Sequence, residues 1–79
     1  MSDDNLEIQV FGMAQDGDGF TLASGVGKKP EFYDIMVSRH LASGEIEAIE
    51  EIDDLTWNAA IQVIAVLEEK YGVLCEWVL

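Results

Sequence analysis

"TWNAAIQVIAVLEEKYG", residues 56–72, decides the fold, because it predicts one long helix in a chain of only 79 residues. Its apolar side chains recur every three to four positions, as in a helix that packs one side against a core. Asp54 or Thr56 can cap its first turn, and Gly72 suits its end. We expect a wide buried arc on this helix. Its members are Trp57, Ala60, Ile61, Val63, Ile64, Val66, Leu67 and Tyr71.

The segments nearest this helix alternate as β-strands do. "VLCEWVL" (73–79) is apolar on both faces apart from Glu76, which predicts a strand at the centre of a sheet. "FYDIMVSRHL" (32–41) has two distinct faces with a period of two. One face carries Tyr33, Ile35, Val37 and Leu41, and the other carries Phe32, Asp34, Met36, Ser38 and His40.

The N-terminal third predicts a hairpin. "LEIQVF" (6–11) alternates between an apolar face and a mixed face, so it indicates a strand. "AQDGDG" (14–19) has two glycines that tolerate positive φ, so it indicates a turn, and "FTLAS" (20–24) would be the returning strand. "GVGKKPE" (25–31) has the composition of a flexible loop.

"GEIEAIEEIDD" (44–54) holds six carboxylates and no basic residue, and its period is ambiguous. Glutamate propensity favours a helix, whereas the isoleucines and the short "ASG" connection (42–44) favour a strand. We expect the strand. One face would then carry Ile46, Ala48 and Ile52, and the other Glu45, Glu47, Ile49, Glu51 and Asp53.

These elements predict an α+β fold in a single compact domain, residues 1–79. About five short, mostly antiparallel strands would form a sheet, with the long helix (about 56–71) packed on one face. One helix cannot cover both faces of a sheet, so a second apolar face should remain available for a homodimer or another partner. We expect it to contain Phe32, Met36, Leu74 and Val78.

The charge is strongly one-sided: 16 acidic and 4 basic residues give a net charge of −12. Such a surface repels nucleic acid and anionic membranes and favours basic partners, so we expect neither direct nucleic-acid binding nor membrane binding. No apolar run approaches the ~20 residues that span a bilayer. The acidic start at Ser2-Asp3-Asp4 and the lone Cys75 predict a cytoplasmic protein.

No motif predicts catalysis, a cofactor or a metal. The only histidine, His40, and the only cysteine, Cys75, have no spacing that indicates a nucleophile–base pair. "DGDG" (16–19) resembles the start of a calcium loop, but the glycine and glutamate required at the sixth and twelfth loop positions are replaced by Thr21 and Gly27. We therefore expect a protein that is not an enzyme.

The acidic stretch is the candidate partner-binding site, because ordered carboxylates bind Lys and Arg through charge-assisted hydrogen bonds. Alternate residues of a strand lie ~6.6–6.8 Å apart, which is of the same order as the distance between successive phosphates along a nucleic-acid strand. Exposed aromatics such as Phe20 or Phe32 could anchor the partner. The candidate site residues are Glu45, Glu47, Glu50, Glu51, Asp53 and Asp54, extended by Asp16 and Asp18.

In size, charge and α+β pattern, the whole chain resembles the small acidic inhibitors encoded by bacteriophages, in particular anti-CRISPR proteins that act on type I systems. The resemblance rests on no motif. It implies a non-enzymatic inhibitor that binds a CRISPR effector complex in the host cytosol and blocks its basic DNA-binding surface, as a DNA mimic does. Immunity proteins and antitoxins that neutralise cationic nucleases share this outline. A small homodimeric structural or adaptor domain is the remaining alternative.

Overall fold

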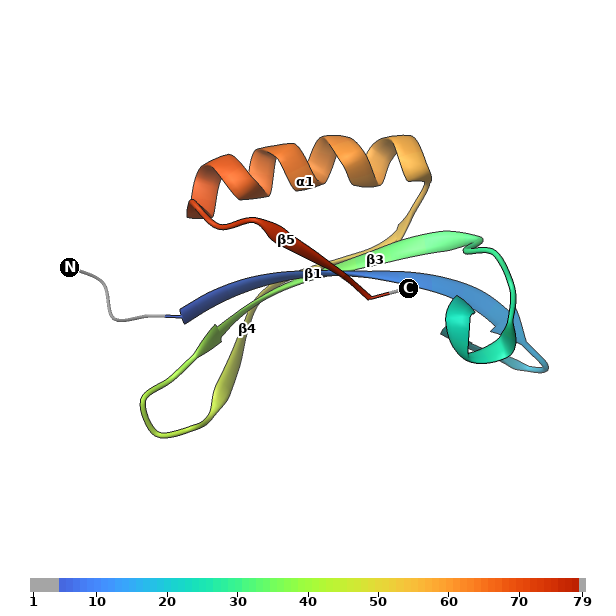
Figure 1. Ribbon diagram of the computed structural model, residues 1–79, viewed down its shortest axis with the longest axis horizontal. Coiled ribbons are helices and arrows are strands. Elements are labelled where there is room, and N and C mark those ends of the chain that lie inside the picture. Colours follow the sequence, from blue (N-terminus) through green and yellow to red (C-terminus); the bar gives the residue numbers. More distant parts are fainter. Residues whose placement is uncertain (1–4, 79) are drawn as a thin grey trace.

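The computed structural model describes residues 5–78, which form one five-stranded sheet, one α-helix and a short 3-10 helix (Figure 1). The predicted α+β fold is confirmed, since three of the four strand pairings are antiparallel and the helix packs against the sheet. The elements in chain order are β1 (Asn5–Asp16), β2 (Gly19–Leu22), η1 (Ala23–Val26), β3 (Phe32–His40), β4 (Ile46–Leu55), α1 (Trp57–Tyr71) and β5 (Cys75–Val78).

Strand β1 is the centre of the sheet. One of its edges pairs with β3, and its other edge is shared by β5 over Ile8–Phe11 and by β2 over Met13–Asp16. The expectation that residues 73–79 form a central strand is therefore wrong, because β5 pairs with β1 alone among the described strands. A 12-residue β1 is long enough for two short strands to divide its edge. Leu79 lies outside the described residues.

The core lies between α1 and one face of the sheet, which we call the helix face. Strands β1 and β3 supply the sheet side of this core, because every second residue of each strand points toward the helix. Thr56 caps α1, since its Oγ1 accepts a hydrogen bond from the Ala59 N–H at 3.2 Å, and Gly72 ends the helix at φ 69°. The fully packed members of this core are Ile8, Val10, Ile35, Val37, Ala60, Ile64 and Leu67.

The buried arc of α1 is narrower than the sequence predicts. Ile61 is 41% exposed and Val66 is 63% exposed, because the helix has a sheet on only one side. At the N-terminal end of α1, Trp57 instead packs beside Tyr33 and Trp77, with ring centroids 5.4–5.5 Å from Trp57. These aromatic rings close one end of the core.

The first hairpin is confirmed with different boundaries. Strand β1 continues to Asp16, and only residues 17–18 turn, with Gly17 at φ 63°. Residues 23–24, expected in the returning strand, belong instead to η1. The turn is tight because Asp16 already pairs with Gly19 across the hairpin.

The acidic stretch forms strand β4, as expected, at the free edge of the sheet next to β3. Two bulges interrupt its pairing, and each one reverses which residues face α1. Val37 pairs with Glu50 but Ser38 pairs with Ala48, so Ile49 is an extra residue. Consequently the expectation that Ile46, Ala48 and Ile52 share one face is wrong.

The bulges distribute the acidic residues over both faces of the sheet. Ala48 lies opposite Ser38 on the face away from α1, whereas Ile52 lies opposite Ile35 on the helix face. The second bulge contains Asp54 at φ 58° and brings Leu55 opposite Tyr33 on the helix face. The carboxylates of β4 therefore do not form one continuous stripe.

Candidate functional site

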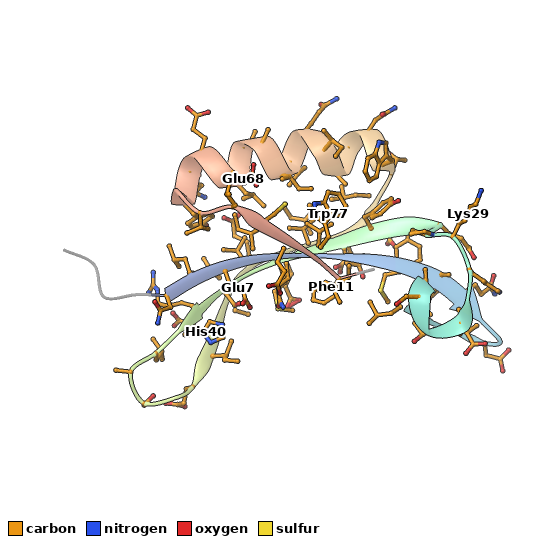
Figure 2. All side chains as sticks on the ribbon, in the orientation of Figure 1. Glu7, Phe11, Lys29, His40, Glu68 and Trp77 are labelled. Atoms are coloured by element: carbon orange, nitrogen blue, oxygen red, sulfur yellow. The ribbon has the colours of Figure 1, made fainter. Side chains whose placement is uncertain are left out.

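The face of the sheet away from α1, here called the open face, carries a groove of about 510 Å³. Within residues 5–78, the α-helix lies against the other face, and Phe11 projects from the open face while Trp77 lies on the side of α1 (Figures 1 and 2). The predicted second apolar face is therefore present, with most of its expected members. Its expected members Phe32, Met36 and Val78 share this face, but Leu74 lies before β5 and is 86% exposed.

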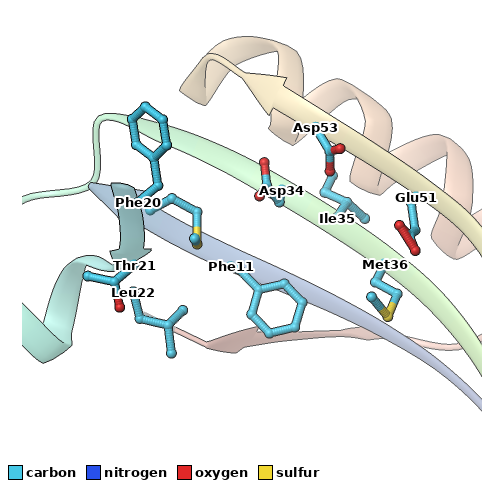
Figure 3. A pocket seen from close by; sticks show the side chains of 10 residues that line it. Phe11, Phe20, Thr21, Leu22, Asp34, Ile35, Met36, Glu51 and Asp53 are labelled. Atoms are coloured by element: carbon cyan, nitrogen blue, oxygen red, sulfur yellow. The ribbon is translucent and has the colours of Figure 1, made fainter. Parts of the chain in front are cut away.

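One side of the groove is apolar and comes from β1 and β2 (Figure 3). Met13 lies opposite Leu22 in the hairpin pairing, so both side chains project on the open face beside Phe11. Phe20 is 62% exposed and packs edge-to-face against Phe32 at a centroid distance of 5.1 Å. Exposed aromatic and sulfur-containing side chains of this kind are typical of binding surfaces.

The other side of the groove is acidic and comes from β3 and β4 (Figure 3). Glu51 lies opposite Met36, and Asp53 follows on the same face. Asp34 lies opposite Phe11, and its Oδ1 accepts a hydrogen bond from the Asp54 N–H at 3.1 Å. We call Asp34, Glu51 and Asp53 the acidic rim.

Within the acidic rim, Asp34 lies where a negative charge is unfavourable. Partial burial raises the pKa of Asp34 above its ordinary value, and the neighbouring charges of Asp53 and Asp54 raise it further. The hydrogen bond from the Asp54 N–H opposes this rise in pKa. A cation placed beside the rim would relieve the repulsion among these carboxylates.

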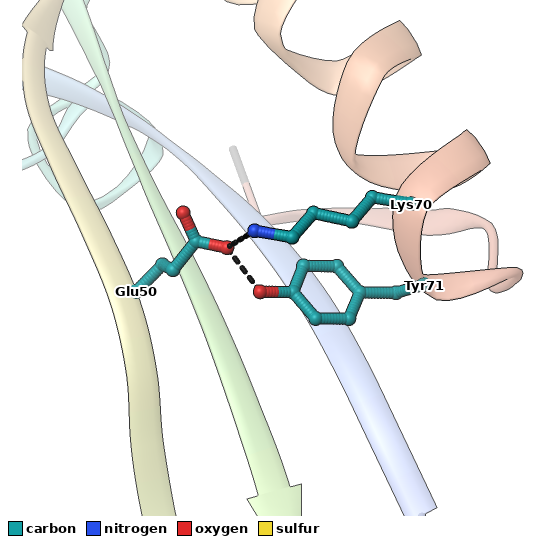
Figure 4. A network of polar contacts seen from close by, with 3 residues as sticks. All are labelled: Glu50, Lys70 and Tyr71. Carbon is teal, nitrogen blue, oxygen red and sulfur yellow. Dashed lines mark hydrogen bonds and ion pairs between the residues drawn. The ribbon is translucent and has the colours of Figure 1, made fainter.

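Glu50, also predicted to bind a partner, points to the opposite face and is engaged within the protein (Figure 4). Its Oε2 accepts hydrogen bonds from the Tyr71 hydroxyl and from Lys70 Nζ, the latter at 3.1 Å. The bond from Tyr71, followed by that from Lys70, lowers the pKa of Glu50. Glu50 therefore joins β4 to the end of α1.

The remaining predicted site residues lie away from the groove. Glu45 accepts a hydrogen bond from Ser43 Oγ at 3.1 Å, and Glu47 forms an ion pair with Arg39 at 3.4 Å, both near the β3–β4 turn. Asp16 and Asp18 lie in the β1–β2 hairpin at the opposite end of the sheet (Figure 1). Of the predicted set, Glu51 and Asp53 line the groove beside Asp34. Asp54 also lies next to Asp34 through its backbone N–H, but it is not part of the groove lining.

His40 and Cys75 lie on opposite faces of the sheet and do not form a pair. His40 Nε2 lies 3.4 Å from Glu7 Oε1 on the open face, whereas Cys75 pairs with Ile8 on the helix face. Burial raises the pKa of the Cys75 thiol, which disfavours the thiolate.

Two features of residues 5–78 bear on the class of site. Their His, Cys, Asp and Glu side chains include no group of three or more arranged to hold a metal ion. None of the helices in the same residues has the length and apolar character needed to cross a membrane.

Sequence reasoning did not include Asp34 among the site residues, nor Phe11, Met13 and Leu22 in the second apolar face. The alternation of residues 32–40 already places Asp34 on the same face as Met36, so the sequence did indicate that Asp34 lies on the second apolar face. It did not show that Glu51 and Asp53 would come to lie beside Asp34, since that depends on the register between β3 and β4.

Comparison with known proteins gives no assignment. No protein-family model matches the chain, and no curated protein or solved structure is found to be significantly similar to it.

Proposed function

We propose that the protein is a non-enzymatic inhibitor that binds a basic, nucleic-acid-binding surface of another protein and blocks it. The observation that supports this proposal is the acidic rim beside an apolar groove on the sheet face opposite α1. Apolar surface supplies affinity, and unneutralised carboxylates select a cationic partner.

The charge of the chain restricts the partner. A net charge of −12 opposes binding to nucleic acid and favours rapid association with a cationic protein surface. Proteins that bind nucleic acid carry such surfaces because they must neutralise phosphates. The resemblance to acidic phage inhibitors makes a type I CRISPR effector complex the first partner to test.

The contact would be made mainly by Glu51, Asp53 and Asp34, with the exposed carboxylates of Glu45 and Glu47 adding charge at one end of β4. Glu50 takes no part, because it is committed to Lys70 and Tyr71 on the helix face.

The direct test measures target-DNA binding by a purified type I CRISPR effector complex with and without the protein. We expect the protein to reduce DNA binding stoichiometrically and less effectively as salt is raised. The variant Asp34→Asn/Glu51→Gln/Asp53→Asn should inhibit at least about tenfold less well. Unchanged DNA binding at a saturating concentration of the protein would reject this effector as the partner. A basic nuclease offered in the same assay format then tests the immunity-protein alternative.

The apolar part of the open face supports a second candidate, a homodimeric adaptor domain. Phe20 and Phe32 would lie in such a dimer interface. Sedimentation velocity at two concentrations tests it. We expect a monomer, because a second copy brings another acidic rim to the same face, whereas a doubled mass would support the adaptor.

A further inference from the structure

The groove on the open face has two chemically different sides. Phe11 and Phe20 supply an apolar side, and the acidic rim supplies the other (Figure 3). Met36 of β3 adds apolar surface opposite Glu51. A purely apolar occupant would bury carboxylates without a cation, and a simple cation would leave the aromatic rings exposed. The occupant that satisfies both sides is a side chain with an apolar stem and a cationic end.

The rim carboxylates are not already neutralised within the described part of the chain. The ion pairs shown there use other carboxylates: Arg39 pairs with Glu47, Lys70 with Glu50, and His40 with Glu7. Charge complementarity therefore calls for a cation from outside the chain.

Arginine suits this site better than lysine does. Its planar guanidinium stacks on aromatic rings and presents several N–H donors to carboxylates at once, whereas the lysine ammonium is a compact, strongly hydrated charge. Phe11 and Phe20 supply the rings, and the rim supplies acceptors from two adjacent strands.

We propose that this groove binds an arginine-bearing segment of the partner protein, with the arginine stem on Phe11 and Met36, its guanidinium on Asp34, Glu51 and Asp53, and the adjoining part of the segment on Phe20. This inference rests on the proposed function and specifies the chemistry of the partner. A groove of about 510 Å³ accommodates one such side chain together with part of the backbone that carries it. A second copy of this chain is a poorer occupant, because it adds carboxylates to the rim.

The test is an NMR titration of the ¹⁵N-labelled protein with the peptide acetyl-Gly-Arg-Gly-Arg-Gly-amide. Matched peptides carry lysine, with the same charge, or citrulline, with the same shape and no charge. We expect amide shift changes concentrated around Phe11, Phe20, Asp34 and Glu51. The arginine peptide should bind at least about threefold tighter than the lysine peptide, and the citrulline peptide should bind weakest.

Two charge-matched variants locate the binding. Asp34→Asn/Glu51→Gln/Asp53→Asn should weaken arginine-peptide binding about tenfold, whereas Asp16→Asn/Asp18→Asn/Glu69→Gln, at exposed positions away from the groove, should change it less than about twofold. Phe20→Ala, at an exposed position, should weaken it without unfolding the protein. Equal weakening by both triple variants, or equal affinity for the lysine and arginine peptides, overturns the proposal.

Two further outcomes separate this inference from the proposed function. If the protein blocks the effector complex while the arginine peptide leaves the groove amides unshifted, the inference fails and the function stands. If the peptide binds the groove but neither an effector nor a basic nuclease is inhibited, the proposed function fails. Concentration-dependent shifts of the groove amides without peptide would show self-association there, which also overturns the arginine proposal.

Discussion

The two faces of the sheet are built from the same strands but differ in what covers them. On the helix face, Ile35 and Val37 are buried under α1. On the open face, their neighbours Asp34 and Met36 line a groove and remain partly exposed. The comparison shows that side chains one residue apart on a strand can serve different purposes, since one set stabilises the fold while the other remains available for binding.

The largest expected effect compares Ile35→Ala with Met36→Ala. Loss of the Ile35 side chain removes core packing and should lower the free energy of unfolding by about 2–5 kcal/mol. Met36→Ala should cost about 1 kcal/mol or less, because the open face is not packed against another layer. Urea denaturation followed by circular dichroism measures both, and Ile35→Val serves if the alanine variant does not fold. Similar losses for the two alanine variants would contradict the distinction between the faces.

The second comparison uses the adjacent residues Glu50 and Glu51. Glu50→Gln should lower the urea midpoint, because it weakens the interaction of β4 with Lys70 and Tyr71. Glu51→Gln should leave the midpoint nearly unchanged and reduce partner binding. If Glu50→Gln weakens the salt-dependent binding of the partner and Glu51→Gln does not, then Glu50 and not Glu51 is the carboxylate that contacts the partner.

Glu50 also predicts a pH dependence. Its pKa is lowered from 4.5 in the folded protein, so below about pH 4.5 the unfolded chain takes up a proton first. The stability that Glu50 contributes should therefore be present above pH 4.5 and be lost as the pH falls through its folded pKa. Urea midpoints measured from pH 7 to pH 3 should show a shallower decline in Glu50→Gln than in the wild type.

Asp34 should behave in the opposite way. Its pKa is raised from 3.8, so its charged form is less favourable in the folded protein than in the unfolded chain. Asp34→Asn keeps an acceptor for the Asp54 N–H and removes the charge, so it should raise the urea midpoint slightly at pH 7. This gain should shrink as the pH falls toward 3.8, where the wild-type carboxyl is protonated. A lower midpoint at pH 7 would show that the rim is stabilising rather than strained by repulsion.

The smallest effect on stability is expected for Phe20→Ala. Phe20 is 62% exposed on a short strand, so the free energy of unfolding should change by no more than about 0.5 kcal/mol. The same substitution should weaken binding of the arginine peptide. A stability loss comparable to that of Ile35→Ala would place Phe20 in the core of the protein instead of at its binding surface.

Local patterns were sufficient to predict most of the elements. The 3.6-residue spacing of residues 57–71, the caps at Thr56 and Gly72, and the alternation of residues 32–40 depend on neighbours in sequence, so the helix and the central strands could be read directly. The strand at 46–55 could be preferred for the same reason. Its faces could not be assigned, because a bulge arises from how one strand pairs with another.

The sequence by itself determined the α+β composition of the protein, the acidic charge and the existence of an uncovered apolar face, since these follow from residue types and short-range periodicity. Tertiary structure decided which carboxylates gather. One extra residue at Ile49 directs Glu50 toward α1 and leaves Glu51 on the open face. The β3–β4 register then places Glu51 and Asp53 beside Asp34, although they follow Asp34 in the sequence by 17 and 19 positions. Such long-range pairing is set by the packing of the whole sheet, which no local pattern encodes.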